Sequence, residues 1–581
     1  MNAPIDDSGA YDVIVFGSGA AGLAAAVVAA SEGMRVGLFE KAPRLGGTTA
    51  TSGGAIWIPC NSHARAAGIR DSIDDARRYL AAQLGRHERR DLVEAYLESG
   101  PEAVDYLASR SEIQFDLAPI PDYVSGDPGA AEAGRCLAPR PFDGARLGRD
   151  FELVRPPRPA FMVLGGLMVG RKEIPQLLHP FASWSSLRSA TRLLWRHARD
   201  RMRYSRGARL LIGNALVARA FSSARALGVA IHTGTALERL VMTDGRVAGA
   251  VVRTPDGARS VRARRAVVLA TGGFAHSPDL RRELGGAFPH EYSLASEENV
   301  GDALRAVREV GGVADHALAS PGFWTPASIA READGREVVY PYGHLDRGKP
   351  GAIIVNRAGR RFVNESDSYH HVVLAMFERG ILRPDDAAFL VCDHAFINRY
   401  GLGLVKPAPF PHGPHLRNGY LKRGATLQEL ARRIGVDERG LALEVERHNR
   451  FAESGKDEDF AKGETAFNRY NGDARGQPNP CLLPIAEPPF YAIELVPCTL
   501  GTAAGIRTDA DARVTDAEGR PIAGLYAVGN DMASVMRGAY PGPGITIGPG
   551  IVFAYRAMRH AARVAPAPAV SIEATGRSPV H

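Results

Sequence analysis

Hydrophobic and polar positions near the start of the chain follow the order strand, glycine loop, helix. The apolar run Val13–Phe16 predicts a buried parallel strand, and an Ala-rich helix is expected after it, as far as about Glu32. Between the two lies the motif Gly17-x-Gly19-x-x-Gly22. A second strand is predicted over 34–39 and ends at Glu40, about 20 residues beyond the glycines, where an acid can bind ribose hydroxyls. This order is typical of a dinucleotide-binding βαβ unit.

Apolar runs and 3.6-residue periodicity predict the remaining elements. A helical pattern covers 71–107, a Pro/Gly-rich stretch that continues to about Arg158 predicts irregular loops, and helices dominate again up to about Leu227. Further strands are expected at 228–235, 246–252, 265–273, 351–356 and 524–531, and further helices at 426–434, 437–454 and up to about Arg563. The alternation of strands and helices indicates an α/β protein.

Each residue of the first glycine loop has a separate physical task. Gly17 permits a tight turn, Gly19 lets the backbone approach a pyrophosphate, and Gly22 lets the helix pack closely on the strand. The first helical residues, Ala20 and Ala21, bring unpaired N–H groups and the positive end of the helix dipole to the same place.

A second loop rich in small and hydroxyl residues follows Glu40, where an NAD-binding domain would normally begin another helix. Small side chains and backbone amides suit a cofactor that lies along the loop, as FAD does, and the alternative is an ordinary surface loop. The cofactor contacts predicted in this loop are Lys41, Gly47, Thr48, Thr49, Ser52, Gly53 and Gly54.

Length and composition narrow the class of protein. A chain of 581 residues should form two large domains. The net charge of +7 is small for this length, which argues against nucleic-acid binding. Five widely spaced cysteines without a CxxC pair favour a reduced compartment and no metal site. The acidic start shows no secretory signal and no run of 18 apolar residues occurs, so we expect a cytoplasmic protein.

One segment of the sequence is compatible with peripheral contact with a membrane. The apolar run Phe161–Val169 precedes a segment that contains eight arginines between 188 and 209. A basic helix beside apolar surface can lie on anionic lipid. The favoured interpretation is a solvated helix whose apolar face packs inward.

The stretch Tyr540-Pro541-Gly542-Pro543-Gly544 predicts a rigid loop immediately before the last helix. Such a loop can direct a tyrosine hydroxyl and a backbone N–H at one point, which suits a carbonyl oxygen that gains negative charge. The alternative is a loop that only cradles the flavin.

Together these motifs resemble flavoproteins of the fumarate reductase superfamily and, within it, the 3-ketosteroid dehydrogenases, from about residue 11 to 562. The resemblance also rests on Ala270-Thr271-Gly272-Gly273 at a strand end and on the Pro-x-x-Leu-Gly-Thr-x-x-Gly-Ile segment at 497–506. It implies a discontinuous Rossmann-like FAD-binding domain that carries an inserted α+β catalytic domain. The expected ranges are 1–279 for the first FAD-binding part (with a helical excursion over about 65–225), 280–488 for the catalytic domain, 489–565 for the return segment and 566–581 for a disordered tail.

The resemblance also implies residue roles. Tyr540 and Gly544 would bind the C3 carbonyl, Tyr369 after Asn-Glu-Ser would remove the ring proton, and Tyr123 would assist. A tyrosine is a poor base unless a partner hydroxyl and a positive field stabilise its anion. The neighbouring histidines, His370 and His371, are alternative proton carriers. Further cofactor contacts are expected at Ala236, Thr271, Gly272, Gly273, Gly529, Asn530, Gly544, Ile545 and Ile547.

The activity implied is FAD-dependent C1–C2 desaturation of a 3-oxosteroid in steroid degradation, with reoxidation by an acceptor such as a quinone. Three alternatives stay open: C4–C5 desaturation of a 3-oxo-5α-steroid, a non-steroid cyclic ketone as substrate, and reduction of a fumarate-like dicarboxylate. The Asp367-Ser368 pair before Tyr369 departs from the family's usual apolar-Pro pair. This departure bears on the choice of substrate.

Overall fold

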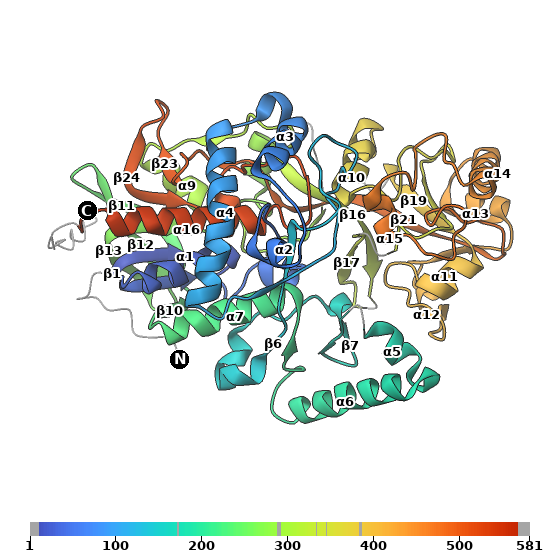
Figure 1. Cartoon of the computed structure of the whole chain (residues 1–581), viewed down its shortest axis with the longest axis horizontal. Helices are drawn as coiled ribbons and strands as arrows, with labels where there is room; N and C mark the ends of the chain where they lie inside the picture. Colours follow the sequence, from blue (N-terminus) through green and yellow to red (C-terminus); the bar gives the residue numbers. More distant parts are fainter. Residues whose placement is uncertain are drawn as a thin grey trace, which may run out of the picture.

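The computed structural model describes residues 11–170, 173–286, 292–332, 334–343, 346–382 and 386–566. Two large β-sheets, each with its own helices, account for most of these residues (Figure 1). The expected disordered tail lies outside the described residues from 567 onward. Within the described residues, no helix has the length and apolar character needed to cross a membrane.

The first sheet contains the predicted βαβ unit at its centre. Its five parallel strands run in the spatial order β10 (Ala230–Thr233), β2 (Val36–Glu40), β1 (Tyr11–Phe16), β13 (Gly257–Leu269) and β24 (Pro521–Ala527). Strands β11 (Ala236–Thr243) and β12 (Arg246–Thr254) extend β13 as an antiparallel ladder, and β23 (Arg513–Thr515) pairs with β24. The central strands contain apolar runs, such as Val13–Phe16 of β1, because helices and the β11–β13 ladder cover both faces.

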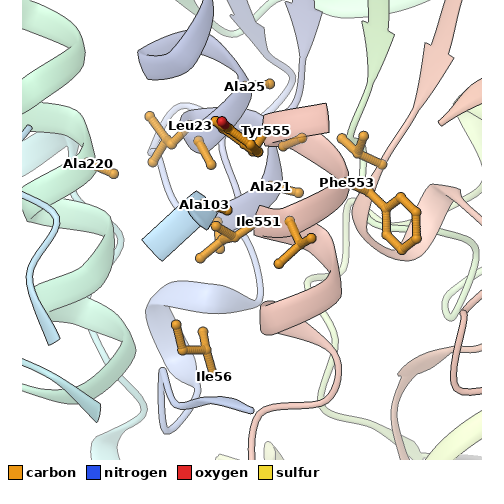
Figure 2. Close-up of a cluster of buried hydrophobic side chains, with 14 of the residues drawn as sticks. Ala21, Leu23, Ala25, Ile56, Ala103, Ala220, Ile551, Phe553 and Tyr555 are labelled. Carbon is orange, nitrogen blue, oxygen red and sulfur yellow. The ribbon is translucent and has the colours of Figure 1, made fainter. Parts of the chain in front are cut away.

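Helix α1 (Ala20–Ser31) packs against the last helix, α16 (Ile547–Arg563). Figure 2 shows Ala21 of α1, Ile551 of α16 and Ala103 of α4 (Arg90–Arg110) in one buried cluster. The alanine-rich surface of α1 lets these helices approach closely. The chain thus brings its final helix back onto the first glycine loop, although more than 500 residues separate them.

The second sheet is built mainly from residues between 292 and 502. Its strands are β14 (Tyr292–Ser293), β16 (Gly322–Arg331), β17 (Glu337–Pro341), β18 (Ala352–Val355), β19 (Ala388–Cys392), β20 (Lys422–Gly424) and β21 (Phe490–Thr502). Its helices are α10 (Tyr369–Glu378), α11 (His394–Tyr400), α12 (Gly413–Arg417), α13 (Leu427–Ile434), α14 (Glu438–Ser454) and α15 (Ala466–Asn471). Strand β21 pairs here, although the predicted boundary placed it in the return segment. The domain ranges themselves stay a prediction.

The remaining helices and strands lie outside the two large sheets. The helices are α2 (Ser62–Ala66), α3 (Ile73–Leu84), α5 (Ile174–Leu178), α6 (Trp184–Arg201), α7 (Ile212–Ala226), α8 (Pro278–Gly285) and α9 (Asp302–Glu309). The strands are β3 (Ile56–Trp57), β4 (Phe115–Leu117), β5 (Cys136–Pro139), β6 (Phe142–Asp143), β7 (Met162–Val163), β8 (Leu167–Met168), β9 (Arg209–Leu210), β15 (Ala314–Asp315) and β22 (Gly505–Ile506). The stretch expected to be irregular therefore contains short strands, which pair with residues distant in sequence.

Candidate active site

A cavity of about 560 Å³ lies between the glycine loops of the first sheet and strands β16 and β17 of the second. Most predicted cofactor residues form its wall, from both ends of the chain. They are Gly17, Gly19, Ala20, Ala21, Glu40, Lys41, Gly47, Thr48, Thr49, Ser52, Gly53, Gly54, Thr271, Gly272, Gly529, Asn530, Gly544 and Ile547.

Four predicted cofactor residues do not form part of this wall: Gly22, Ala236, Gly273 and Ile545. Thr235 and Leu237 line the cavity, but Ala236 between them does not. Successive side chains of an extended chain point to opposite sides, which explains this difference. Gly273 packs where a Cβ atom would lie 2.1 Å from the Thr502 hydroxyl. These residues support the wall from behind.

The first glycine loop leaves bare backbone at the cavity. Gly17 has a φ of +97°, and a Cβ atom there would lie 2.1 Å from the carbonyl oxygen of Ala270. A Cβ at Gly22 would lie 1.9 Å from the carbonyl oxygen of Gly17, so helix and strand can pack only with glycine. At Gly19 the nearest atom to an added Cβ is 3.6 Å away. Open backbone at the start of α1 fits a pyrophosphate group.

Glu40 ends β2 at the cavity wall and is 7% exposed. Its carboxylate accepts hydrogen bonds from the N–H groups of Ser18 (2.9 Å) and Ala42 (2.8 Å). Burial raises the pKa of Glu40. The side chain is therefore held in one orientation beside the glycine loop, which fits the binding of a ribose.

One part of the wall was missed by the sequence analysis. Leu294, Ser296, Glu298, Asn299 and Asp302 line the cavity just before and at the start of α9. The N–H of Ser296 donates to the Thr48 hydroxyl at 2.8 Å, and Lys41 pairs with Asp302 at 2.9 Å. The only signal in the sequence is a polar stretch before a helix, which is common on ordinary surfaces.

The three predicted tyrosines meet at the cavity, although they come from segments more than 150 residues apart. The Tyr123 hydroxyl donates to the Tyr369 hydroxyl oxygen at 3.2 Å. The ring of Tyr540 stacks on that of Tyr123, with centroids 5.6 Å apart, and meets the Tyr369 ring edge-on at 5.0 Å. All three rings line the cavity.

Buried hydrogen bonds hold the Tyr123 and Tyr540 loops together. The carbonyl oxygen of Pro541 accepts from the Tyr123 N–H (2.8 Å) and from the Tyr79 hydroxyl (2.6 Å). The indole of Trp57 donates to the Asp122 carboxylate at 2.7 Å. Trp57 is fully buried and lies behind the wall, so it supports the tyrosine loop.

Tyr369 is the first residue of α10, and buried polar groups fix the chain before it. Ser368 caps the helix by accepting from the His371 N–H at 3.2 Å. Glu365 pairs with Arg361 (2.8 Å) and Lys462 (3.1 Å), and Arg361 also pairs with Asp457 at 2.8 Å. The side chains of Arg361, Glu365, Lys462 and Asp457, called here the Glu365 network, have no exposed surface.

Burial of the tyrosines disfavours a negative charge, while hydrogen bonds among them and one buried cation partly oppose this effect. Burial raises the pKa of Tyr123, Tyr369 and Tyr540 well above the usual value. The charge of Arg347 acts on Tyr123 and Tyr369 in the opposite direction. Arg347 is fully buried and donates to the carbonyl oxygen of Glu365. It supplies a positive field at Tyr123 and Tyr369, and nothing in its sequence surroundings marked it.

The neighbouring histidines have different surroundings. The Nδ1 atom of His370 accepts from the Trp324 N–H at 3.2 Å, and its ring packs on Tyr540 at 5.6 Å. Burial lowers the pKa of His370, so this imidazole is neutral. Burial also lowers the pKa of His371, which lies near the carboxylate of Asp367.

Gly544 completes the tyrosine end of the cavity. Its φ is +97°, and a Cβ atom there would lie 2.5 Å from the carbonyl group of Ala55. Within the described part of the chain its N–H has no hydrogen-bond acceptor. A backbone donor and the Tyr540 hydroxyl are thus both present at the wall, as an anchor for a carbonyl oxygen requires.

Comparison with known proteins agrees with this architecture. The model of the FAD binding domain family matches residues 12–547. The chain is 38% identical to 4-oxocyclohex-2-ene-1-carboxylate 5-dehydrogenase of Sinomonas cyclohexanicum, over 96% of this chain and 95% of the relative. It is 36% identical to 3-oxosteroid 1-dehydrogenase of Mycolicibacterium smegmatis, over 94% and 96%.

A solved structure gives the same result. The crystal structure of 3-ketosteroid delta1-dehydrogenase from Sterolibacterium denitrificans, in complex with 1,4-androstadiene-3,17-dione, superposes with a TM-score of 0.85. It is 36% identical and covers 95% of this chain and 99% of that one. The expected fold and cofactor are thereby confirmed. The chain belongs to the 3-ketosteroid dehydrogenase family of FAD-binding flavoproteins and is an FAD-dependent oxidoreductase.

Proposed function

We propose that this enzyme removes two hydrogens from the C1–C2 bond of a 3-oxosteroid. The observation that carries the proposal is the meeting of Tyr123, Tyr369 and Tyr540 at one cavity wall that also includes Gly544. A carbonyl anchor and a base are what desaturation next to a ketone needs, because an unactivated C–H bond does not release a hydride. Apolar wall residues, including Ile120, Phe161 and Leu500, suit a steroid skeleton.

The Tyr540 hydroxyl and the Gly544 N–H donate hydrogen bonds to the 3-oxo oxygen. Their role is to stabilise the negative charge that this oxygen gains when the neighbouring carbon loses a proton. The rigid Pro/Gly loop and its contact with Ala55 hold both donors in place before substrate arrives. Such preorganisation favours the transition state over the bound ketone.

Tyr369, as its phenolate, takes the proton from C2. Tyr123 then donates a hydrogen bond to the Tyr369 oxygen, and Arg347 offsets part of the negative charge. His370 keeps Tyr540 in position by ring packing, and its imidazole is uncharged. FAD, when bound, supplies the acceptor for the hydride from C1.

The electron acceptor belongs to the same proposal. We propose a quinone as the acceptor class. The first glycine loop is assigned to FAD, and the sequence contains no further motif that could bind a nicotinamide dinucleotide. Flavin reoxidation by a quinone would close the catalytic cycle and would be measured separately from substrate oxidation.

One observation favours a second candidate substrate, a 4-oxocyclohexane-type carboxylate. Arg158 lies in the cavity wall and donates to the carbonyl oxygen of Leu294. No carboxylate pairs with it among the residues that the structure describes, and burial lowers its pKa. A carboxylate on the substrate would satisfy this cation, and one relative carries the name of such an activity. C4–C5 desaturation remains the alternative outcome for a steroid.

The test is anaerobic reduction of the flavin in the purified holoenzyme. Four compounds are mixed separately with the enzyme: a 3-oxo-4-ene steroid, a saturated 5α-3-oxosteroid, 4-oxocyclohexanecarboxylate and succinate. Products are identified by mass and NMR. Bleaching by the 4-ene steroid with a new C1–C2 double bond supports the proposal.

The other outcomes overturn it in distinguishable ways. Formation of a 4-ene from the 5α compound alone would establish C4–C5 chemistry. Bleaching by the oxocyclohexane carboxylate alone, with loss of that reaction in Arg158→Gln, would establish the second candidate. Bleaching by succinate alone would assign the dicarboxylate chemistry instead.

A further inference from the structure

Helix α6 exposes apolar side chains on the side that faces away from the protein. Its inward face consists of Ala190, Leu193, His197 and Asp200. On the opposite face Trp184 is 81% exposed, Trp195 is 65% exposed and Met202, just after the helix, is 78% exposed. The turn before the helix adds Phe181, which is 87% exposed. The favoured expectation, an apolar face packed inward, is therefore wrong for these side chains.

Arginines flank this apolar row on one side. Arg188, Arg192, Arg199 and Arg203 fall beside Trp184 and Trp195 at helical spacing, and all four are exposed. No carboxylate pairs with them among the described residues, although Arg199 covers the Trp195 ring at 5.3 Å. Asp200 is the only acid between 174 and 209 in the sequence, and it faces inward, where it accepts from the Ala208 N–H at 3.0 Å. The face is thus apolar and uniformly positive.

The same segment leads into the cavity wall. Arg158 and Phe161 line the cavity, and Phe161 is directly followed by β7 and β8, whose connecting residue Leu164 accepts from His197 of α6 (2.9 Å). Leu164 is itself 65% exposed. In Figure 1, α6 lies along the lower edge of the molecule, beneath β7 and α5. Whatever covers α6 also lies near this part of the wall.

We propose that the α6 face (Phe181, Trp184, Arg188, Arg192, Trp195, Arg199, Met202 and Arg203) docks on the surface of an anionic lipid bilayer. Exposed tryptophans prefer the boundary between headgroups and acyl chains, while arginines attract anionic headgroups. The charge distinguishes this occupant from a second copy of the chain, since two copies of the same positive face repel each other. Docking would bring the Phe161 side of the cavity close to a phase that dissolves apolar ketones and quinones. The inference goes beyond the proposed function and does not depend on it.

The tryptophans of the native protein report on the docking directly. The chain has four tryptophans, of which Trp57 and Trp324 are 0% and 1% exposed. A blue shift of the emission on vesicle binding must therefore come mainly from Trp184 and Trp195. We expect this shift, together with co-sedimentation, for vesicles that contain phosphatidylglycerol, a weaker response for pure phosphatidylcholine, and loss of the response at high salt.

Two triple variants distinguish docking through the α6 face from attraction by the net charge of the whole protein. Arg188→Gln/Arg192→Gln/Arg203→Gln should weaken binding to phosphatidylglycerol vesicles about 100-fold, since each arginine near an anionic surface contributes a factor of about five. The matched control, Arg379→Gln/Arg417→Gln/Arg439→Gln, removes the same charge from exposed positions elsewhere and should bind like the native enzyme. Flavin content and helicity measured on each variant verify that it is folded.

The proposal is overturned by any of three results. The first is equal vesicle binding by both triple variants, and the second is the absence of a blue shift with anionic vesicles. The third is a native dimer that Trp184→Ser/Trp195→Ser converts to a monomer, which would assign the face to a second copy. These measurements are made without substrate, so a failure of the steroid assay leaves them unaffected.

Discussion

The two ends of the cavity are constructed in different ways. The glycine end consists of backbone from loops 17–22 and 46–54, where the absence of a side chain is what matters. The tyrosine end consists of side chains from three distant segments, each held by buried polar contacts. A change at the glycine end should therefore abolish cofactor binding, whereas a change at the tyrosine end should leave the flavin bound and slow the reaction.

The largest expected effect is at Gly22. In Gly22→Val the added Cβ would lie 1.9 Å from the Gly17 carbonyl oxygen, so α1 must separate from β1. We expect purified protein with flavin occupancy lowered at least about tenfold, a loss of about 1.4 kcal/mol or more in binding. The absorbance ratio of flavin to protein measures this. Gly285→Ala, where an added Cβ meets nothing within 4 Å, is the control and should be fully loaded.

Tyr369→Phe should give the next largest effect. It removes the proposed base while it keeps the ring contacts with Tyr123 and Tyr540. Flavin reduction by substrate, followed by stopped-flow absorbance, should slow by about 10³-fold at unchanged flavin content. A rate within threefold of the native enzyme would show that another group takes the proton.

Tyr540→Phe should have a smaller effect because Gly544 remains as a second donor to the carbonyl oxygen. We expect a loss of about 10²-fold in kcat, with a smaller change in KM, since the lost hydrogen bond strengthens as the oxygen gains charge. Steady-state kinetics with the best substrate distinguish this from a binding defect. An increase in KM alone, at native kcat, would contradict the assigned role.

The smallest expected effect concerns pH. Tyr369 must lose its proton to act, and burial raises its pKa, so flavin reduction should quicken by about tenfold per unit as pH rises toward that pKa. Arg347 lowers the pKa of Tyr369, so Arg347→Met should move the profile to higher pH. Arg347→Lys keeps the charge and should restore the profile. A uniform loss of rate without a shift would mean that Arg347 only positions the loop.

The same contrast explains how much could be predicted from the sequence. The glycine end is local, so Gly17, Glu40 and the small-residue loop identified it through spacing alone. The Pro/Gly loop identified Tyr540 from the sequence itself, whereas Tyr123 and Tyr369 were found only through resemblance, because no spacing rule relates the three residues. Arg347 and the 294–302 segment were missed, since their importance arises from packing between distant parts of the chain.

The strand bounds show a related limit. The predicted strand at 265–273 begins at Gly257 in the structure and ends at Leu269. Its polar first half forms a ladder with β12, which apolar periodicity does not reveal, and the glycines after it form the cavity loop. Apolar runs thus located a part of each predicted strand, while tertiary pairing determined where the strands begin and end.

The Glu365 network has an evolutionary consequence. Its two cations and two anions balance in charge. Loss of any one member therefore leaves an opposite charge unpaired in the interior, which lowers the free energy of unfolding by about 3–5 kcal/mol. A substitution at one of the four network residues is therefore tolerated only in a protein in which another of the four has already been substituted. The segment that presents Tyr369 is constrained by epistasis among residues that never meet the substrate.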